Sequence, residues 1–528
     1  MIMKTLNLSE LTVKQKLGLT MTAHVGKLAD VDSAVELIKA HSLGCVWVIP
    51  TMKDHAEAMR RIKEAADYPV LIMCDAESGI GSHKIGRHNA IGCTGSEELA
   101  YIFGKVTALT AKKMGYNVIC DPVLDMVTCN FTCGGTVRSI GKDKYEVTRL
   151  AAAEARGFHD CGVLTVAKHY PGKAKSGRFV DSHMGETVSD ETAEQLLNYN
   201  LYPYVQLSKQ GLIDGVMLKH ARFPNIDPEY PASLSPKLIK ILRDQGYNGF
   251  AMTDALSMMG VVAKFGKKGC IGLSVGNAAD LALPYNEKDT YEPYEALCEA
   301  YEKGIITDER LNEAAQRVLD AQAKTLMEPK FTEITDEDIK TFARLNTDSV
   351  FERADEGVSK ALDRNGKYYF AILSESEVDV NNRDAIQVDT MDKQWFNPFA
   401  IADKLKELFP NSIAKTICEF PSRESIVKIL DESLEYDDTI FITFYNSQAY
   451  VGTEHFTSRI TSLITAMQVS DRISTVVHFG NPYLLEELPH IPRVLIGTCA
   501  ADNIIAALEV LAGEREAKGV LTYDIELK

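Results

Sequence analysis

The sequence lacks the short motifs that mark the common nucleotide and metal sites. It contains no Gly-rich phosphate loop ending in Lys-Ser or Lys-Thr, no dinucleotide fingerprint, no HExxH motif and no EF-hand loop. Its eleven cysteines include no CxxC pair, and we interpret the closest two, Cys129 and Cys133, as part of a loop rather than as metal ligands. We therefore expect no metal and no cofactor.

The chain also lacks an excess of positive charge and any long apolar segment. Fifty-seven basic and 74 acidic residues give a formal net charge of -17. Such a surface repels phosphate backbones and anionic lipid, so we expect neither nucleic acid nor a membrane as a partner. No secretion signal or membrane span is visible. Cysteines within apolar runs, such as Cys45, Cys74, Cys120 and Cys161, are typical of reduced thiols in a cytoplasmic protein.

The first 290 residues alternate between short apolar runs and amphipathic segments. A chain of 528 residues is too long for one ordinary core, so we expect two domains. Segments of helical period include residues 32–41, 55–66, 96–114, 144–160, 191–210 and 236–246. The strand-like runs cover residues 19–24, 44–50, 68–75, 116–121, 162–169, 214–220, 247–254 and 278–285. Eight strand-then-helix units favour an α/β fold of the (β/α)8 TIM-barrel type, although the periodicity also fits a doubly wound sheet.

Most of these apolar runs end in a polar residue. Each such residue has a simple explanation, because Asp caps helices and His is often a satisfied core residue. That explanation would have to apply six times. Since the active site of a barrel lies at the carboxyl ends of its strands, we instead expect these side chains to share one pocket. They are His24, Asp75, Asp121, Lys168 with His169, His220 and Asp254.

Two of the predicted strands are followed by groups suited to proton transfer and nucleophilic attack. After the fifth, residues 168–183 read KHYPGKAKSGRFVDSH, so Asp181 can orient the imidazole of His183, although Asp-x-His alone is a weak signal. After the seventh, Asp254 projects from a rigid strand end, and Lys168 at a neighbouring strand end favours its ionised form. This pairing follows the logic of retaining glycoside hydrolysis. Asp254 attacks the anomeric carbon, while His183 protonates the leaving oxygen and then activates water.

The pattern changes after residue 285. A helix over residues 308–324 ends the first domain, and residues 328–347 form a charged, poorly periodic connector. Strand candidates at 368–373, 439–445, 475–479 and 494–498 then alternate with helical segments at 422–430, 458–469 and 503–511. We predict a TIM-barrel catalytic domain over residues 1–330, a linker over 331–360 and a smaller α/β sandwich domain over 361–528.

Several motifs occur in a fixed order along the chain. They include KHYPG followed by DSH, VMLKHARFPNIDPEYPASLS, LRDQGYNGFAMTDALSM and NAADLALPY, with LTVKQKLG, PVLIMCDAESG, AIGCTGSEELA, GYNVICDPVLDM and VRSIG around them. Together they resemble glycoside hydrolase family 3, and within it the β-N-acetylglucosaminidase branch, over most of residues 10–330. The resemblance implies a two-domain retaining exo-glycosidase that hydrolyses terminal β-linked N-acetylglucosamine-type sugars through a covalent glycosyl-enzyme intermediate.

The resemblance also implies roles for individual residues. Asp254 matches the catalytic nucleophile of the family. Asp181 and His183 match the Asp-Ser-His dyad of the branch, in which the histidine replaces the usual carboxylic acid as general acid and base. The matches to substrate-binding residues are Asp75, Arg138, Lys168 and His169, of which Arg138 rests on the resemblance alone.

The sequence departs from the family in two places. Residues 173–178 replace the usual Gly-His-Gly-Asp-Thr, and Glu77-Ser78-Gly79-Ile80 replaces Glu-Gly-Gly-Arg, which removes an expected arginine. The added cations Lys173, Lys175 and Arg178 either face an anionic substituent on the substrate or form a solvated basic surface. The altered loop, residues 173–180, is expected to change how His183 is delivered.

Three alternatives to hydrolysis of an N-acetylglucosaminide stay open. A phosphorylase would use phosphate as the acceptor, since a histidine base does not repel an anion. A β-glucosidase or β-xylosidase of the same family would draw its acid from Glu454, which we otherwise expect at the surface or at an interface. A non-catalytic carbohydrate-binding relative would explain the altered loop. In each case the partner is a small carbohydrate, and the sequence does not predict the oligomeric state.

Overall fold

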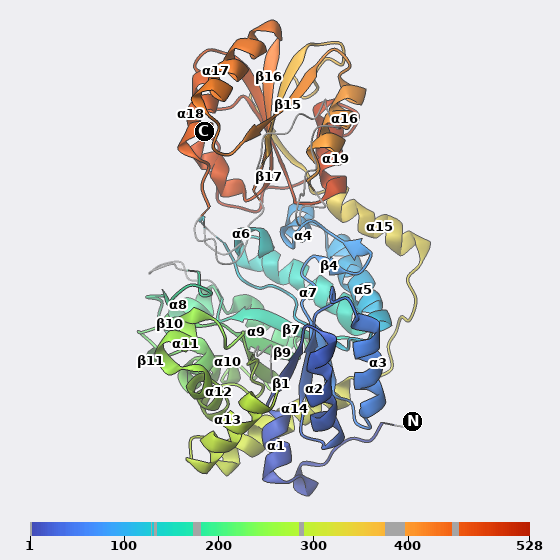
Figure 1. Cartoon of the computed structure of the whole chain (residues 1–528), viewed down its shortest axis with the longest axis vertical. Helices are drawn as coiled ribbons and strands as arrows, with labels where there is room; N and C mark the ends of the chain where they lie inside the picture. Colours follow the sequence, from blue (N-terminus) through green and yellow to red (C-terminus); the bar gives the residue numbers. More distant parts are fainter. Residues whose placement is uncertain are drawn as a thin grey trace. The chain divides into compact units, whose positions relative to one another are not determined.

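The chain folds into two compact units, shown in a computed structural model (Figure 1). The first comprises Met1–Lys84, Glu97–Met126 and Asp143–Phe342, and the second comprises Ile85–Ser96, Val127–Lys142 and Ala343–Lys528. The structure describes residues 3–127, 129–130, 135–172, 181–284, 290–374, 396–445 and 454–528.

The first unit is built around a closed parallel sheet. Seven strands pair in the order β1 (Thr22–Val25), β2 (Cys45–Val48), β3 (Leu71–Cys74), β6 (Val118–Ile119), β7 (Leu164–Tyr170), β9 (Gly215–Leu218) and β12 (Phe250–Thr253). Leu281 forms a parallel bridge with Met252 of β12, and Ala282 forms one with Met21 beside β1. The eighth strand position therefore closes the sheet into the expected (β/α)8 barrel.

The barrel interior is filled by alternate residues of the strands. Cys45 and Trp47 of β2, Leu71 and Met73 of β3, and Phe250 and Met252 of β12 belong to one buried apolar cluster. Their spacing of two residues is the strand period, so the intervening side chains point outward to the helices. This explains why the apolar runs of a barrel are continuous rather than alternating.

Helices connect successive strands, as the sequence pattern predicts (Figure 1). They include α2 (Val31–Lys39), α3 (His55–Ala65), α5 (Glu97–Met114), α7 (Lys144–Asp160), α10 (Pro236–Arg243), α12 (Lys267–Asn277), α13 (Tyr291–Glu302) and α14 (Asp308–Lys324). The helix expected over residues 191–210 is instead divided into α8 (Ala193–Asn198) and α9 (Tyr202–Lys209). Pro203 lacks an N–H to donate, so it fits the first turn of α9 and not the interior of one long helix.

Shorter elements lie in the loops. They are α1 (Val13–Leu19), β4 (Gly79–Ile80), β5 (His83–Lys84), α4 (Asn89–Thr94), α6 (Gly135–Arg138), β8 (Thr187–Val188), β10 (Ala221–Phe223), β11 (Asp227–Pro231) and α11 (Met259–Phe265). At the carboxyl side of the barrel, β8 pairs in parallel with β10. This pairing holds residues 187–188, which follow the loop after β7, in place.

The second unit is an α/β sandwich. Its sheet has the order β13 (Phe351–Ala354), β18 (Arg493–Gly497), β17 (Ile473–Gly480), β16 (Asp438–Tyr445), β14 (Tyr368–Ser374) and β15 (Ile413–Cys418). Only the β13–β18 pair is antiparallel. One face packs on α16 (Pro398–Leu408) and α19 (Ala501–Leu511), and the other packs on α17 (Arg423–Glu432) and α18 (Ser458–Gln468) (Figure 1).

Part of the segment that the sequence marks as a connector is helical. Residues 328–347 contain α15 (Asp336–Thr347), which the charged pattern did not indicate. Thr335 and Asp338 exchange side-chain to backbone hydrogen bonds at its start, and Asp338 also binds the buried ammonium of Lys105 at 2.8 Å. The helix also has a buried face, formed at helical spacing by Asp338, Thr341, Phe342, Leu345 and Asn346.

Across the residues that the structure describes, no helix is both long enough and apolar enough to cross a bilayer.

Candidate active site

Lys168 holds two carboxylates together at the carboxyl side of the barrel. It lies in β7 with a side chain that is 1% exposed, and its Nζ is 2.5 Å from Oδ1 of Asp75 and 2.6 Å from Oε1 of Glu77. A buried ammonium requires counter-charges of this kind. The Asp75 side chain, which follows β3, is 55% exposed, so it is the member of the cluster that a ligand can reach. Glu77 was not nominated from the sequence.

His169, the next residue of β7, is oriented by a second carboxylate. Its Nδ1 is 2.7 Å from Oδ2 of the buried Asp125, which lies in the loop after β6. An ionised carboxylate only accepts, so Nδ1 carries the hydrogen and Nε2 is the other, basic nitrogen. Lys219, directly after β9, places its Nζ 3.9 Å from Oδ1 of Asp125. Asp125 and Lys219 were not identified from the sequence. The available signal was that each follows an apolar run, in CDPVLDM and in VMLKH.

Asp181 and His183 form a hydrogen-bonded dyad on the loop after β7. Oδ1 of Asp181 accepts from Nδ1 of His183 at 2.8 Å and from the His183 backbone N–H at 2.9 Å. The Asp181 side chain is fully buried, whereas that of His183 is 24% exposed. The pair therefore has a fixed carboxylate and an accessible imidazole, with Nε2 on the side away from Asp181.

Asp254 stands directly at the end of β12. Its backbone N–H continues the strand ladder by donating to the Leu218 carbonyl at 2.9 Å, and its Oδ1 accepts from the Ala255 N–H at 2.7 Å. These bonds fix both the main chain and the carboxylate of a half-buried residue. Such rigidity is what a nucleophilic carboxylate requires.

His220 supports the chain just after Asp254. It is fully buried, its Nε2 donates to the Ala255 carbonyl at 2.9 Å, and its Nδ1 is 2.8 Å from the Ser233 hydroxyl. Burial lowers the pKa of His220, the Asp254 carboxylate acts in the opposite direction, and His183 and His169 lower it further. His169, His220 and Asp254 lie at the ends of the neighbouring strands β7, β9 and β12, and the turn of His183 contacts the helix α11 that follows Asp254.

Two further residues that follow strands of the barrel are buried, and two residues proposed from the sequence, Arg138 and Glu454, belong to the second unit. His24 and Asp121 are almost inaccessible to solvent. Arg138, in the second unit, ends α6, and its backbone carbonyl is 3.2 Å from Nδ1 of His88 in the same unit. The roles of Arg138 and of the first-unit residues Asp75, Lys168 and His169 in sugar binding stay predictions.

Of the two positions expected for Glu454, the surface or an interface, the structure excludes the surface. It is 1% exposed, and its Oε2 accepts a hydrogen bond of 2.6 Å from the side-chain amide of Asn481. Its backbone carbonyl accepts another, of 2.9 Å, from the side chain of Asn130. Such amide donors allow a carboxylate to be buried. Cys133, Lys173, Lys175, Arg178 and the rest of the altered 173–180 loop lie outside the described residues.

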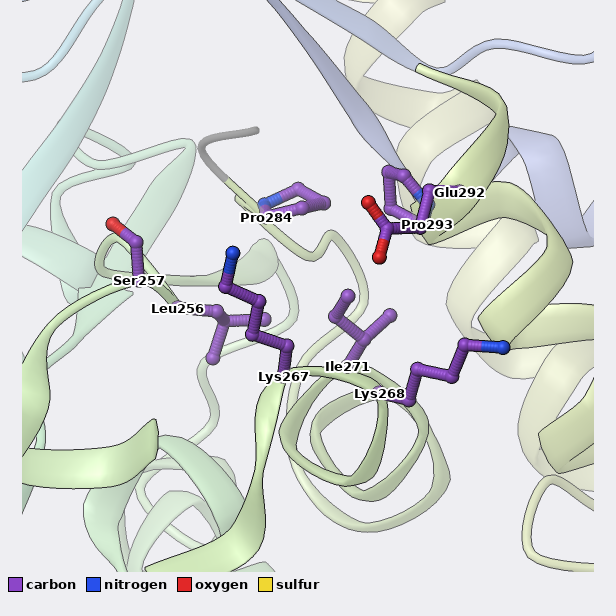
Figure 2. A pocket seen from close by; sticks show the side chains of 8 residues that line it. All are labelled: Leu256, Ser257, Lys267, Lys268, Ile271, Pro284, Glu292 and Pro293. Atoms are coloured by element: carbon purple, nitrogen blue, oxygen red, sulfur yellow. The ribbon is translucent and has the colours of Figure 1, made fainter. Parts of the chain in front are cut away.

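A hollow opens beside the segment after Asp254 (Figure 2). Its lining is largely apolar, from Leu256, Ile271, Pro284 and Pro293, while the side chains of Lys267 and Glu292 point into it (Figure 2). Neither Asp254 nor His183 is part of this lining.

Comparisons with known proteins agree on one family. The sequence model of the glycosyl hydrolase family 3 N-terminal domain matches residues 10–321, more than half of the chain. The β-hexosaminidase of Idiomarina loihiensis is 30% identical over 246 residues, which cover 44% of this chain and 72% of that protein.

Two solved structures share the fold of the whole chain. A glycoside hydrolase family 3 β-N-acetylglucosaminidase from Paenibacillus sp. superposes with a TM-score of 0.79 at 24% identity, over 98% of this chain and all of that one. A β-glucoside phosphorylase superposes with a TM-score of 0.82 at 23% identity, over 98% of this chain and 95% of that one. At these identities the likeness concerns the fold, a barrel followed by a sandwich.

Proposed function

Because this chain belongs to glycosyl hydrolase family 3, we propose that it is a retaining exo-β-N-acetylglucosaminidase. The observation that carries the proposal is the Asp181–His183 hydrogen bond of 2.8 Å on the loop after β7, together with the fixed carboxylate of Asp254 at the end of β12. This pair offers an imidazole acid and a carboxylate nucleophile, the two groups that double displacement at an anomeric carbon needs.

In the first step, the Asp254 carboxylate attacks the anomeric carbon as the bond to the leaving oxygen breaks. His183, in its imidazolium form, gives the Nε2 proton to that oxygen. Asp181 keeps the other ring nitrogen protonated and stabilises the cation before the transfer. The product is an ester between Asp254 and the sugar.

In the second step, the now neutral Nε2 of His183 takes a proton from water as the water oxygen attacks the same carbon. The ester bond breaks and the Asp254 carboxylate is released. Each displacement inverts the anomeric carbon, so the β configuration of the substrate is retained.

The remaining polar residues of the first unit serve to bind the sugar in this proposal. Asp75 is exposed and held by Lys168, which suits it to accept hydrogen bonds from sugar hydroxyls. His169 is oriented by its 2.7 Å contact with Asp125, which suits it to a directional contact. We assign Arg138 to the same task on the resemblance alone. The cations Lys173, Lys175 and Arg178 support a substrate with an anionic substituent.

Phosphorolysis is the second candidate, because the acid and base is an imidazole. A neutral histidine does not repel an incoming phosphate, whereas a carboxylate base would. The same two steps would then end in a sugar 1-phosphate, with phosphate in place of water.

We also place the protein in the cytoplasm. Seven of the ten cysteines that the structure describes are buried, which suits core thiols in a reducing compartment.

The decisive test is hydrolysis of aryl β-glycosides by the wild type and by Asp254→Asn, with and without phosphate. We expect selective release from the N-acetylglucosaminide, a loss of at least about 10³-fold in the variant, and a β-configured first product by NMR. Sugar 1-phosphate formation would favour phosphorolysis, and preferred release from the glucoside or xyloside would assign the chain to another specificity. A wild type inactive on every glycoside would contradict the proposal.

A further inference from the structure

The turn that carries His183 rests on the helix that follows Asp254. The first two backbone N–H groups of α11, those of Met259 and Gly260, donate to the carbonyls of His183 at 3.4 Å and Ser182 at 3.0 Å. Helix α11 has no side-chain cap, so these N–H groups have no partner within the helix. The loop carbonyls replace the missing cap.

Gly260 allows this contact because it has no Cβ. A Cβ at this position would lie 2.8 Å from the carbonyl oxygen of Gly185 and 2.9 Å from that of Ser182. Both atoms belong to backbone, so the clash cannot be relieved by a side-chain rotation. Gly260 is not among the glycines with positive φ, and its position inside a helix suits alanine. The turn therefore excludes a side chain at residue 260 by its close approach, and the backbone conformation does not.

The turn is also held by contacts outside α11: the His183 N–H donates to Oδ1 of Asp181, Glu186 pairs with Arg222 at 3.3 Å, and β8 pairs with β10. Within residues 182–188 no side chain is buried, and Met184 is exposed. Asp181 closes the turn by accepting from the N–H groups of Met184 and Gly185, and β8 begins at Thr187. The backbone contact with α11 adds a direct link between this turn and the helix that follows Asp254.

We propose that Gly260 is a positioning residue, which sets the distance between His183 and the anomeric carbon bound at Asp254. The inference rests on the function proposed above. Replacement by alanine pushes the turn away from α11, so the proton transfers of His183 slow while attack by Asp254 is kept. A displacement of the imidazole on the order of 1 Å is expected to lower kcat/KM by about 10-fold to 100-fold.

The test compares Gly260→Ala with Gly269→Ala, a glycine of α12 whose added Cβ would meet no atom of another described segment within 4 Å. Circular dichroism and thermal unfolding first establish that both variants fold. Activity is then measured on an N-acetylglucosaminide with a poor leaving group and on its 2,4-dinitrophenyl analogue, which leaves without a proton. Each assay is repeated with azide, which attacks the glycosyl-enzyme, frees the Asp254 carboxylate and forms a β-glycosyl azide without proton transfer.

We expect Gly260→Ala to lose activity mainly on the poor leaving group and to regain turnover of the activated substrate with azide, while Gly269→Ala matches the wild type. Equal losses on both substrates with no azide effect, or full activity in Gly260→Ala, would overturn the inference.

Hydrogen exchange tests the contact without any substrate. The amides of residues 259 and 260 should exchange at least about 10-fold faster in Gly260→Ala than in Gly269→Ala. Unchanged protection in a folded variant would contradict the contact. A wild type that hydrolyses no glycoside would instead refute the proposed function, while leaving this measurement informative.

Discussion

A single oxygen of Asp181, Oδ1, binds His183 twice, once through the imidazole Nδ1 at 2.8 Å and once through the backbone N–H at 2.9 Å. The side chain and the main chain of His183 are therefore oriented by the same buried carboxylate. The first bond fixes the ring and the second fixes the turn.

Because of this double contact, two variants can measure the effect of the Asp181 charge separately from the effect of its hydrogen bonds. Asp181→Asn keeps an oxygen that accepts both hydrogen bonds, but it removes the negative charge that stabilises the imidazolium. Asp181→Ala removes both. We expect kcat to fall by about 10-fold to 100-fold in the first variant and further in the second. Steady-state kinetics on an N-acetylglucosaminide measure this, and equal losses in the two variants would show that charge plays the greater part.

Glu77 is expected to matter through Lys168. Lys168→Met removes the buried cation that binds both Asp75 and Glu77, so it should lower both thermal stability and kcat/KM, the latter by at least about 10²-fold. Glu77→Gln keeps an acceptor for the ammonium and should cost less than Lys168→Met in both measurements. A larger effect of Glu77→Gln on kcat/KM, with stability unchanged, would instead indicate that Glu77 contacts the substrate itself.

Asp280 supports the amino-terminal side of the barrel. Its carboxylate is fully buried and binds Arg243 at 2.9 Å, Arg310 at 2.8 Å and Arg317 at 3.1 Å. Burial lowers the pKa of Arg243, and Asp280 opposes this effect. Asp280→Asn leaves three guanidinium groups without that charge and should lower the free energy of unfolding by about 3 to 5 kcal/mol.

Denaturant unfolding of Asp280→Asn beside Glu57→Gln provides the comparison. Glu57 forms an exposed pair with Arg60, and its replacement should change stability little. Similar losses in the two variants would contradict the assigned role of Asp280.

His478 should make the second unit sensitive to acid. It is buried between the Thr443 hydroxyl and the Asn481 carbonyl, and burial lowers its pKa from 6.5 to about 4. Between these values the unfolded chain binds a proton that the folded chain does not, so stability falls as the pH drops from about 6.5 to about 4, by up to about 3 kcal/mol. Above pH 6.5 this histidine contributes no pH dependence.

The measurement is thermal unfolding from pH 7.5 to pH 4 in the wild type, in His478→Gln and in His455→Gln, where His455 is exposed. We expect His478→Gln alone to flatten the curve in this window. A wild-type slope retained in His478→Gln would assign the acid sensitivity to other groups.

The barrel was predictable because its evidence is local. Each strand buries both faces, so it reads as an apolar run, and each surface helix carries one apolar stripe. Helix α7 has the predicted bounds, residues 144–160. The misses have local causes as well. Pro203 divides the helix expected over 191–210. The acidic first turn of α15 obscures a buried face that includes Phe342 and Leu345.

The sequence by itself determined the strand ends and thus the presence of Asp75, Lys168, His169 and Asp254 at one rim, because parallel strands of a barrel all end on the same side. Only the tertiary structure decided which groups meet there. Glu77 reaches Lys168 and Asp125 reaches His169 across 91 and 44 residues of chain, and the Ser182 carbonyl lies on Gly260. No periodic pattern encodes contacts at such separations, since they depend on how neighbouring loops pack above the closed sheet.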